Sequence, residues 1–159
     1  MNKNYRMNRT LVFDMDGTIA NLYGVEGWLE MLRAEDATPY AIAEPMYRMD
    51  ILVTILRYFR ILGWKIVVTT WLAKDATKAY DAEVTKVKKE WLDRYGFPYD
   101  DFNAVEYGTP KTEVTAKMGG YQVLIDDDDN IREAWYLGKT INAKKNIMGE
   151  LVALLDAIN

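Results

Sequence analysis

One short stretch limits what this chain can fold into more than any other: Leu11-Val12-Phe13-Asp14-Met15-Asp16-Gly17-Thr18. Its three leading apolar residues are typical of a buried parallel strand, which presents apolar side chains on both faces of a sheet. Asp14 and Asp16 then fall in the loop at the carboxyl end of this strand, where open α/β sheets bind their ligands. Gly17 allows the loop to turn tightly, and Thr18 can cap or anchor the segment that follows.

The rest of the chain alternates between strand-like and helix-like segments. Short apolar runs predict further strands at residues 66–69, 104–107, 121–125 and 140–143. Apolar residues at helical spacing predict helices at 25–34, 49–62, 76 or 82 to 95, 112–118 and 130–137, and one at the C-terminal end. Alternation of this kind favours an α/β fold with a doubly wound, mainly parallel sheet.

The residue types that are absent from the chain limit the catalytic chemistry that it can perform. The 159 residues are about one domain's worth and contain no Cys, no His and no Ser. Disulfides, thiolate metal sites and Ser-His or Cys-His catalysis are therefore excluded. Any catalysis must use carboxylates, Lys, Thr, Tyr or a metal ion held by oxygen. The net charge of −4 argues against general nucleic-acid binding, which requires a basic face.

The sequence gives no sign of a membrane segment. The first nine residues are polar and basic, without the apolar stretch of a signal peptide. The longest apolar run, residues 51–62, is interrupted by Arg57 and Arg60. We therefore expect a cytoplasmic protein that does not bind membranes.

Polar groups follow the ends of several predicted strands. They are Asp14 with Asp16, Thr70, the loop that carries Lys111, and Asp126 with Asp127. The carboxyl ends of parallel strands meet at one edge of a sheet, so we expect these groups to converge. Crowded carboxylates repel one another unless a cation holds them, and an all-oxygen ligand set suits Mg²⁺. With Lys and Thr left to hold a phosphoryl group, the sequence predicts phosphoryl transfer.

These residues, in this order, resemble the four motifs of haloacid dehalogenase-like phosphatases, over about residues 11–143. The resemblance implies that Asp14 is the nucleophile, which forms an aspartyl-phosphate. Asp16 would protonate the leaving oxygen and then activate water. Thr70 would donate a hydrogen bond to the phosphoryl oxygens, and Lys111 would neutralise their charge and pair with Asp14.

The same resemblance implies a Mg²⁺ site. Its ligands would be the Asp14 carboxylate, the backbone carbonyl of Asp16 and the Asp126 carboxylate. Asp127 would support the site from behind these ligands. The next two residues, Asp128 and Asp129, are instead expected to start a helix, where their charge complements the helix dipole.

Two assignments have competitors close by in the sequence. Thr69 competes with Thr70, which we prefer because the family residue sits just past the strand. Lys117 competes with Lys111, which we prefer because it opens a helix, whereas Lys117 falls inside one.

Within the superfamily, the nearest resemblance is to the cytosolic-type 5′(3′)-deoxyribonucleotidases. It rests on residues 14–17, 90–96, 110–112 and 124–127. The insertion between the first two motifs is shorter here than in that family. The resemblance implies an α/β core of residues 1–20 and 62–159, with residues 21–61 forming a small helical cap. It also implies a small phosphorylated substrate, with a nucleoside monophosphate as the first candidate.

Aromatic residues suggest where such a substrate would lie. Trp71 follows Thr70 directly, so Trp71 and Thr18 are candidates for substrate contacts. Trp28 shares a helical face with Leu29 and Leu32, and we expect that face to pack in the core.

Other functions remain open at this stage. The substrate could be a sugar phosphate or a phosphorylated nucleic-acid end. A signalling receiver domain also combines an acidic pocket, Thr and Lys, but it carries its adjacent acidic pair first, whereas here Asp126 and Asp127 come last. A non-catalytic phospho-ligand-binding module on the same fold is disfavoured by the intact Asp14 and Asp16. The sequence gives no indication of the oligomeric state.

Overall fold

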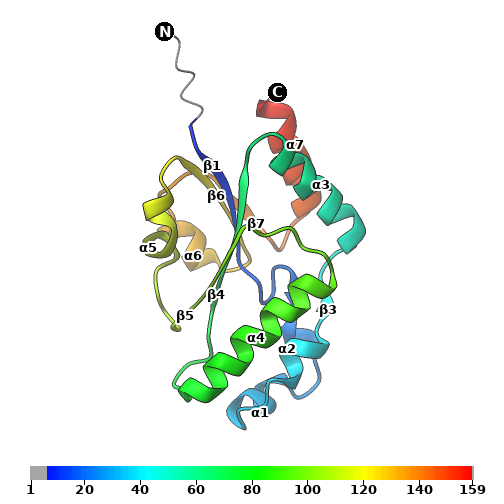
Figure 1. Ribbon diagram of the computed structural model, residues 1–159, viewed down its shortest axis with the longest axis vertical. Helices are drawn as coiled ribbons and strands as arrows, with labels where there is room; N and C mark the ends of the chain where they lie inside the picture. The colour runs from blue at the N-terminus through cyan, green and yellow to red at the C-terminus, as the bar shows by residue number, and fades with distance from the viewer. Residues whose placement is uncertain (1–6, 159) are drawn as a thin grey trace.

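A parallel five-stranded sheet lies at the centre of the computed structural model, which describes residues 7–158 (Figure 1). Its strands are β1 (Arg9–Phe13), β4 (Lys65–Trp71), β5 (Asp101–Val105), β6 (Tyr121–Asp126) and β7 (Thr140–Asn142). They follow the order β5-β4-β1-β6-β7, and all neighbouring pairs are parallel. The chain builds outwards from β1 first in one direction and then in the other. The predicted doubly wound α/β fold is therefore confirmed, with β1 at the point where the winding reverses.

Helices cover both faces of this sheet. On one face, α3 (Met49–Ile61) packs against α7 (Ile147–Ile158), while α5 (Lys111–Thr115) and α6 (Asp129–Ala134) lie on the opposite side (Figure 1). Helix α4 (Lys78–Arg94) joins β4 to β5, and a short 3-10 turn, η2 (Ala116–Met118), follows α5.

The central strand β1 is buried on both sides, as its apolar run predicts. Leu11 and Phe13 belong to the larger core cluster, which also takes in α3 and α7. Val12 points to the other face and packs with Leu124 and Trp135. This alternation follows from the two-residue period of a strand and leaves the end of β1 firmly placed in the core.

A small insert follows β1 and covers the carboxyl edge of the sheet. Strands β2 (Ala20–Asn21) and β3 (Glu44–Pro45) pair antiparallel at its base, and η1 (Leu22–Gly24), α1 (Trp28–Arg33) and α2 (Thr38–Ile42) lie between them. Figure 1 shows α1 and α2 beyond the strand ends, beside α4. Tyr40 of α2 packs with Tyr80 and Val84 of α4 in a separate small cluster. The indole of Trp91 also donates a 2.8 Å hydrogen bond to the carbonyl of Ala43, which ties the insert to α4.

Helix α3 packs differently from the rest of the residues expected in the cap. Its Leu52, Leu56 and Phe59 are fully buried in the main core cluster. The division into a core of 1–20 and 62–159 and a cap of 21–61 stays a prediction, and this packing favours a shorter insert that ends at β3. Residues 1–6 of the expected core lie outside the described residues.

Helix α1 is shorter than predicted, and only part of its expected apolar face packs in the core, where Trp28 and Leu32 lie partly buried against the cluster around Tyr40 and Tyr80. Gly27 adopts a φ of +74°, a left-handed conformation that glycine tolerates, and regular helix begins only at Trp28. Leu29 is exposed, and no residue of α1 is fully buried. Among the helices within residues 7–158, none has both the length and the apolar character to cross a bilayer.

The packing of α3 predicts a clear difference between two substitutions on that helix. Leu56 is 0% exposed, so Leu56→Ala leaves a cavity and should lower the free energy of unfolding by about 2–5 kcal/mol. Ile61 is 78% exposed, so Ile61→Ala should change it by less than about 0.5 kcal/mol. Urea unfolding of the two variants measures the difference. Equal, small effects would show that α3 does not belong to the core.

Candidate active site

The loop after β1 is a tight turn held by backbone hydrogen bonds. The amide of Asp14 donates to the carbonyl of Ile125 at 2.9 Å, which keeps Asp14 beside the end of β6. Three later amides, those of Thr18, Ile19 and Ala20, donate to the carbonyl of Met15. Gly17 has a φ of +80°, and a Cβ on it would lie 2.6 Å from Oδ2 of Asp127. Glycine at this position therefore lets the loop fold against Asp127.

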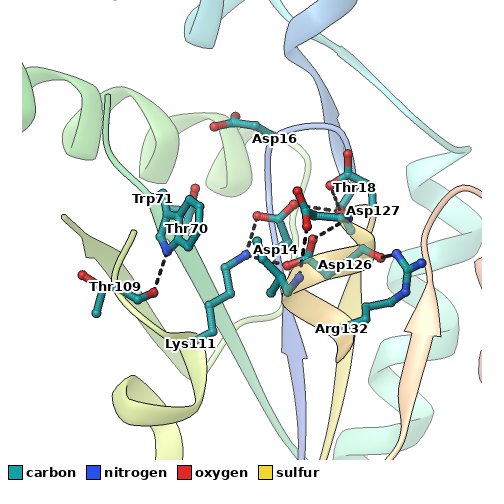
Figure 2. A network of polar contacts seen from close by, with 12 residues as sticks. Asp14, Asp16, Thr18, Thr70, Trp71, Thr109, Lys111, Asp126, Asp127 and Arg132 are labelled. Carbon is teal, nitrogen blue, oxygen red and sulfur yellow. Dashed lines mark hydrogen bonds and ion pairs between the residues drawn. The ribbon is translucent and has the colours of Figure 1, made fainter. Parts of the chain in front are cut away.

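Asp14 lies between a cation and a hydroxyl group (Figure 2). The Lys111 ammonium is 2.8 Å from Oδ1 of Asp14 and 2.7 Å from Oδ2 of Asp126. The hydroxyl of Thr18 donates to Oδ2 of Asp14 at 2.9 Å. Burial alone would lower the pKa of Lys111, but the two carboxylates outweigh that penalty and raise it. The lysine is therefore charged, and it fixes the orientation of Asp14.

Three carboxylates could hold a metal ion here. Asp14, Asp126 and Asp127 each offer an oxygen atom, and these atoms lie within 4.8 Å of one another. Burial, followed by the charge of Asp14, raises the pKa of Asp126 to about 6 and that of Asp127 to about 7. A divalent cation would relieve this repulsion, and an all-oxygen set is the kind that Mg²⁺ prefers. The donor set and the close approach allowed by Gly17 fit Mg²⁺, with Asp127 among the candidate carboxylates and not only behind them; the Asp16 backbone carbonyl as a ligand stays a prediction.

Asp16 lies apart from this cluster, although it is only two residues from Asp14. Figure 2 shows its carboxylate directed away from Asp14. Its partner is Lys88 of α4, whose ammonium is 2.8 Å from Oδ2 of Asp16. Burial raises the pKa of Asp16, and the charge of Lys88 partly offsets this rise. A raised pKa suits a carboxyl group that has to carry a proton.

The structure separates the competing candidates. Thr70 faces the same cavity as Asp14, and its hydroxyl oxygen accepts a 2.8 Å hydrogen bond from Lys88. Thr69 is fully buried on β4, and its hydroxyl has no hydrogen-bond partner among the described residues. Lys111 reaches Asp14, whereas Lys117 is exposed in η2.

Asp128 and Asp129 start α6, as the sequence predicts. The carboxylate of Asp128 caps the helix by accepting from the amide of Ile131 at 3.0 Å. Asp129 pairs with Arg132, and Arg132 also donates to the backbone carbonyl of Asp126 at 2.9 Å. Arg132 of α6 therefore helps to hold the backbone of Asp126 in place.

A cavity of about 610 Å³ opens over these groups. Its floor is formed by the acidic residues with Thr70 and Lys111, and much of its wall is apolar or aromatic: Leu22, Tyr23, Trp28, Leu29, Leu32, Tyr40, Trp71, Leu72, Ala73, Tyr107 and Ile131. Arg33 and Lys74 also line it. The size lies within the usual range for small-molecule sites.

Two tryptophans contribute to this wall. Trp28 is half-buried: it packs against the small core cluster that contains Tyr40 and Tyr80, as expected, and it also lines the cavity. It packs edge-on against Tyr23, with ring centroids 5.0 Å apart. Trp71 is fixed by a 2.8 Å hydrogen bond from its indole to the carbonyl of Thr109 and lies against Tyr107.

Sequence reasoning missed Lys88, and it also missed Arg33, Lys74 and Tyr107 in the cavity lining. We expect α4 to bury Val84, Val87, Trp91 and Tyr95, but the buried positions include Lys88 itself. A signal was present, because Lys88 lies four residues after Val84 and three before Trp91, on the same helical face.

Comparison with known proteins supports the fold. The sequence matches no protein-family model and no curated protein. D,D-heptose 1,7-bisphosphate phosphatase from Burkholderia thailandensis is structurally similar, with a TM-score of 0.57 and 10% identity over 93% of this chain and 99% of that one. A chain in the structure of the Pnkp1/Rnl/Hen1 RNA repair complex gives a TM-score of 0.56 and 16% identity over 89% of this chain, but this chain spans only 45% of that one. At these identities the structural similarity establishes a shared α/β fold with a parallel sheet and nothing further.

The acidic cluster predicts how stability responds to pH and Mg²⁺. The raised pKa values mean that Asp126 and Asp127 bind more protons in the folded protein than in the unfolded chain between about pH 4 and 7. Without metal, the free energy of unfolding should therefore fall as the pH rises through this window. Asp127→Asn should flatten the slope, because it removes one of the groups responsible.

Mg²⁺ should raise the unfolding temperature more at pH 8 than at pH 5, because protons compete for the same carboxylates. Thermal unfolding with chelator and with Mg²⁺ measures both effects. An identical Mg²⁺ shift in the wild type and in the Asp127→Asn and Asp126→Asn variants would show that the ion binds elsewhere.

Proposed function

We propose that this protein is a Mg²⁺-dependent phosphomonoester hydrolase that acts through an aspartyl-phosphate on Asp14. The observation that carries the proposal is the placement of the Asp14 carboxylate. It faces a large cavity, Lys111 and Thr18 fix its orientation, and Asp16 and Thr70 line the same cavity. A fixed carboxylate beside a phosphoryl site is what nucleophilic catalysis on phosphorus requires.

The first step transfers the phosphoryl group to Asp14. A carboxylate oxygen of Asp14 attacks phosphorus, and the bond from phosphorus to the leaving oxygen breaks. Asp16 gives its proton to that oxygen, so the product leaves as a neutral alcohol. Thr70 donates a hydrogen bond to the transferring group, and Lys111 offsets its negative charge.

The second step returns the enzyme to its starting state. Asp16, now ionised, accepts a proton from water as the water oxygen attacks phosphorus. The acyl phosphate bond breaks, which frees inorganic phosphate and restores the Asp14 carboxylate. Asp14, Asp126 and Asp127, with the backbone carbonyl of Asp16, would hold Mg²⁺, which would supply positive charge to offset that of the phosphoryl oxygens.

The walls of the cavity favour a leaving group with a flat apolar surface. Trp28, Trp71 and Tyr107 offer aromatic faces on which a base can stack, and stacking of this kind is tolerant of base identity. A nucleoside monophosphate is therefore the first substrate candidate. The hydroxyl of Thr18 donates a hydrogen bond to Asp14 and lies 3.3 Å from Oδ1 of Asp127. We therefore assign Thr18 to orienting these carboxylates and not to binding the substrate.

A phosphorylated polynucleotide end is the second candidate. The fold resembles a chain found in an RNA repair complex, and Arg33 and Lys74 line the cavity, where they could pair with a second phosphate. A sugar phosphate is the third, since the heptose bisphosphate phosphatase shares the fold, but the apolar wall offers a sugar few hydrogen-bonding groups.

Phosphate release with Mg²⁺ tests the reaction. The panel contains deoxy- and ribonucleoside 5′- and 3′-monophosphates, sugar phosphates, a 3′- and a 5′-phosphorylated oligonucleotide, and 4-nitrophenyl phosphate. Asp14→Asn should reduce turnover to background, and Asp16→Asn should reduce it about 10²–10⁴-fold. Asp156→Asn, an exposed site on α7, is the matched control. Wild-type rates in Asp14→Asn would remove Asp14 as the nucleophile, and no release from any ester would remove the proposed function.

Trp28 tests the nucleotide assignment separately. Base stacking contributes about 1–3 kcal/mol, so Trp28→Ala should raise KM for nucleoside monophosphates by about 5- to 150-fold. The KM for 4-nitrophenyl phosphate and for sugar phosphates should rise less. Tyr58→Ala, an exposed aromatic residue on α3, is the control. An equal change for all esters would show that Trp28 shapes the cavity without binding a base.

A further inference from the structure

We propose that Lys88 is a positioning residue that holds Asp16 and Thr70 in a fixed arrangement, with Asp16 as the proton donor and Thr70 as the phosphoryl-binding hydroxyl. The proposal rests on the proposed function for the roles of these two residues. It adds a third participant that contacts neither the metal-binding carboxylates nor the nucleophile among the recorded hydrogen bonds and ion pairs of residues 7–158.

The surroundings of Lys88 are unusual for a lysine. Its side chain is 0% exposed, and its ammonium donates to three oxygen atoms: Oδ2 of Asp16 at 2.8 Å, the hydroxyl of Thr70 at 2.8 Å and the carbonyl of Trp71 at 3.1 Å. The ring of Tyr40, from the insert, lies 4.9 Å from the same nitrogen. An ammonium group has three N–H donors, and three acceptors are present.

This arrangement fixes the direction of the Thr70 hydroxyl. An ammonium group can only donate, so the oxygen of Thr70 has to accept from Lys88. The hydrogen of Thr70 must then point to another acceptor. Thr70 lines the cavity above Asp14, so a phosphoryl oxygen bound there is the acceptor that the arrangement provides. Lys88 therefore presents Thr70 as a donor before any substrate arrives.

The same nitrogen places Asp16 beside Thr70. Because both oxygens accept from one ammonium group, a phosphoryl group held by Thr70 lies next to the carboxyl group of Asp16. The bond to the carbonyl of Trp71 anchors Lys88 to the end of β4, so this arrangement keeps its position relative to the sheet. One residue of α4 thus sets the geometry of the two residues that must act on the same ester.

Stability alone is a weak reason to keep a charged residue in this position. The desolvation free energy of a buried ion pair is about as large as the attraction between its charges. Well-packed apolar side chains in the same place often give a protein that is equally or more stable. Val84 and Trp91, on the same face of α4, show the apolar alternative. A lysine with all its donors used at the active site is better explained by positioning.

The first test measures binding without turnover. Affinity for inorganic phosphate in the presence of Mg²⁺ is measured by calorimetry for the wild type, K88M, T70V and K88M/T70V. K88M and T70V should each weaken binding about tenfold, and the double variant should be no weaker than T70V, because Lys88 acts through Thr70. K86M is the control, since Lys86 is exposed on the same helix. Multiplying effects would mean that Lys88 acts only by its charge and would overturn the proposal.

The second test compares leaving groups. An alkyl phosphate needs a proton donor, whereas 4-nitrophenolate leaves without one. K88M should therefore lower kcat/KM at least about tenfold more for the alkyl ester than for 4-nitrophenyl phosphate. In the D16N background, K88M should lower kcat/KM for the alkyl ester only slightly further. K88Q, which keeps an uncharged N–H donor, is measured alongside so that the comparison does not depend on one variant folding. Equal losses for both esters would overturn the role of Lys88 in placing Asp16.

The two tests separate this proposal from the proposed function. If the wild type releases no phosphate from any ester but the binding cycle is non-additive, the hydrolase assignment fails and the link between Lys88 and Thr70 stands. If the wild type hydrolyses esters while binding effects multiply and losses are equal for both leaving groups, the hydrolase assignment stands, Lys88 acts only by its charge, and its positioning role fails.

Discussion

The shared contact of Asp14 and Asp126 with Lys111 is the interaction on which the rest of the site depends. The two carboxylates are only 8% and 1% exposed, and an uncompensated charge buried this far costs several kcal/mol. The Lys111 ammonium is equally buried, so each charge needs the others. The start of α5 at Lys111 and the pairing of β6 with β1 bring these three charges together. Any metal ion or phosphoryl group that enters the site joins a charge balance that already exists.

Much of the site follows from the sequence because strand ends are predictable. An apolar run that stops at a polar residue marks where a parallel strand leaves the sheet, and parallel strands leave at the same edge. Asp14 and Asp126 satisfy that pattern, and the structure brings them to one cavity with Thr70, although β4 continues through Thr70 to Trp71 instead of ending before it. The position of Lys111 was harder to predict, because β5 ends at Val105 and a loop separates it from Lys111, which contacts Asp14. Its position at the first turn of α5 was the useful clue.

The parts that the sequence did not predict depend on contacts between distant segments. The pattern of α4 marks its buried face, but nothing local says that a lysine on that face will find three acceptors. Those acceptors come from Asp16, Thr70 and Trp71, which belong to two other segments of the chain. Trp28 was predicted only in part. It packs against the small core cluster, as its helical neighbours predict, but its place in the insert also leaves it lining the cavity.

Two lysines each pair with one of two carboxylates that are almost adjacent in the sequence. Lys111 pairs with Asp14 and Asp126, and Lys88 pairs with Asp16 and Thr70. In the proposed reaction the nucleophile has to stay ionised and the proton donor has to hold a proton, so the two groups need different surroundings. The turn at Gly17 starts this separation by folding the loop towards Asp127, and α4 completes it by supplying Lys88 from the side of the insert. Because Tyr40 of the insert lies against Lys88, the segment that covers the cavity is also in contact with the residue that orients the acid.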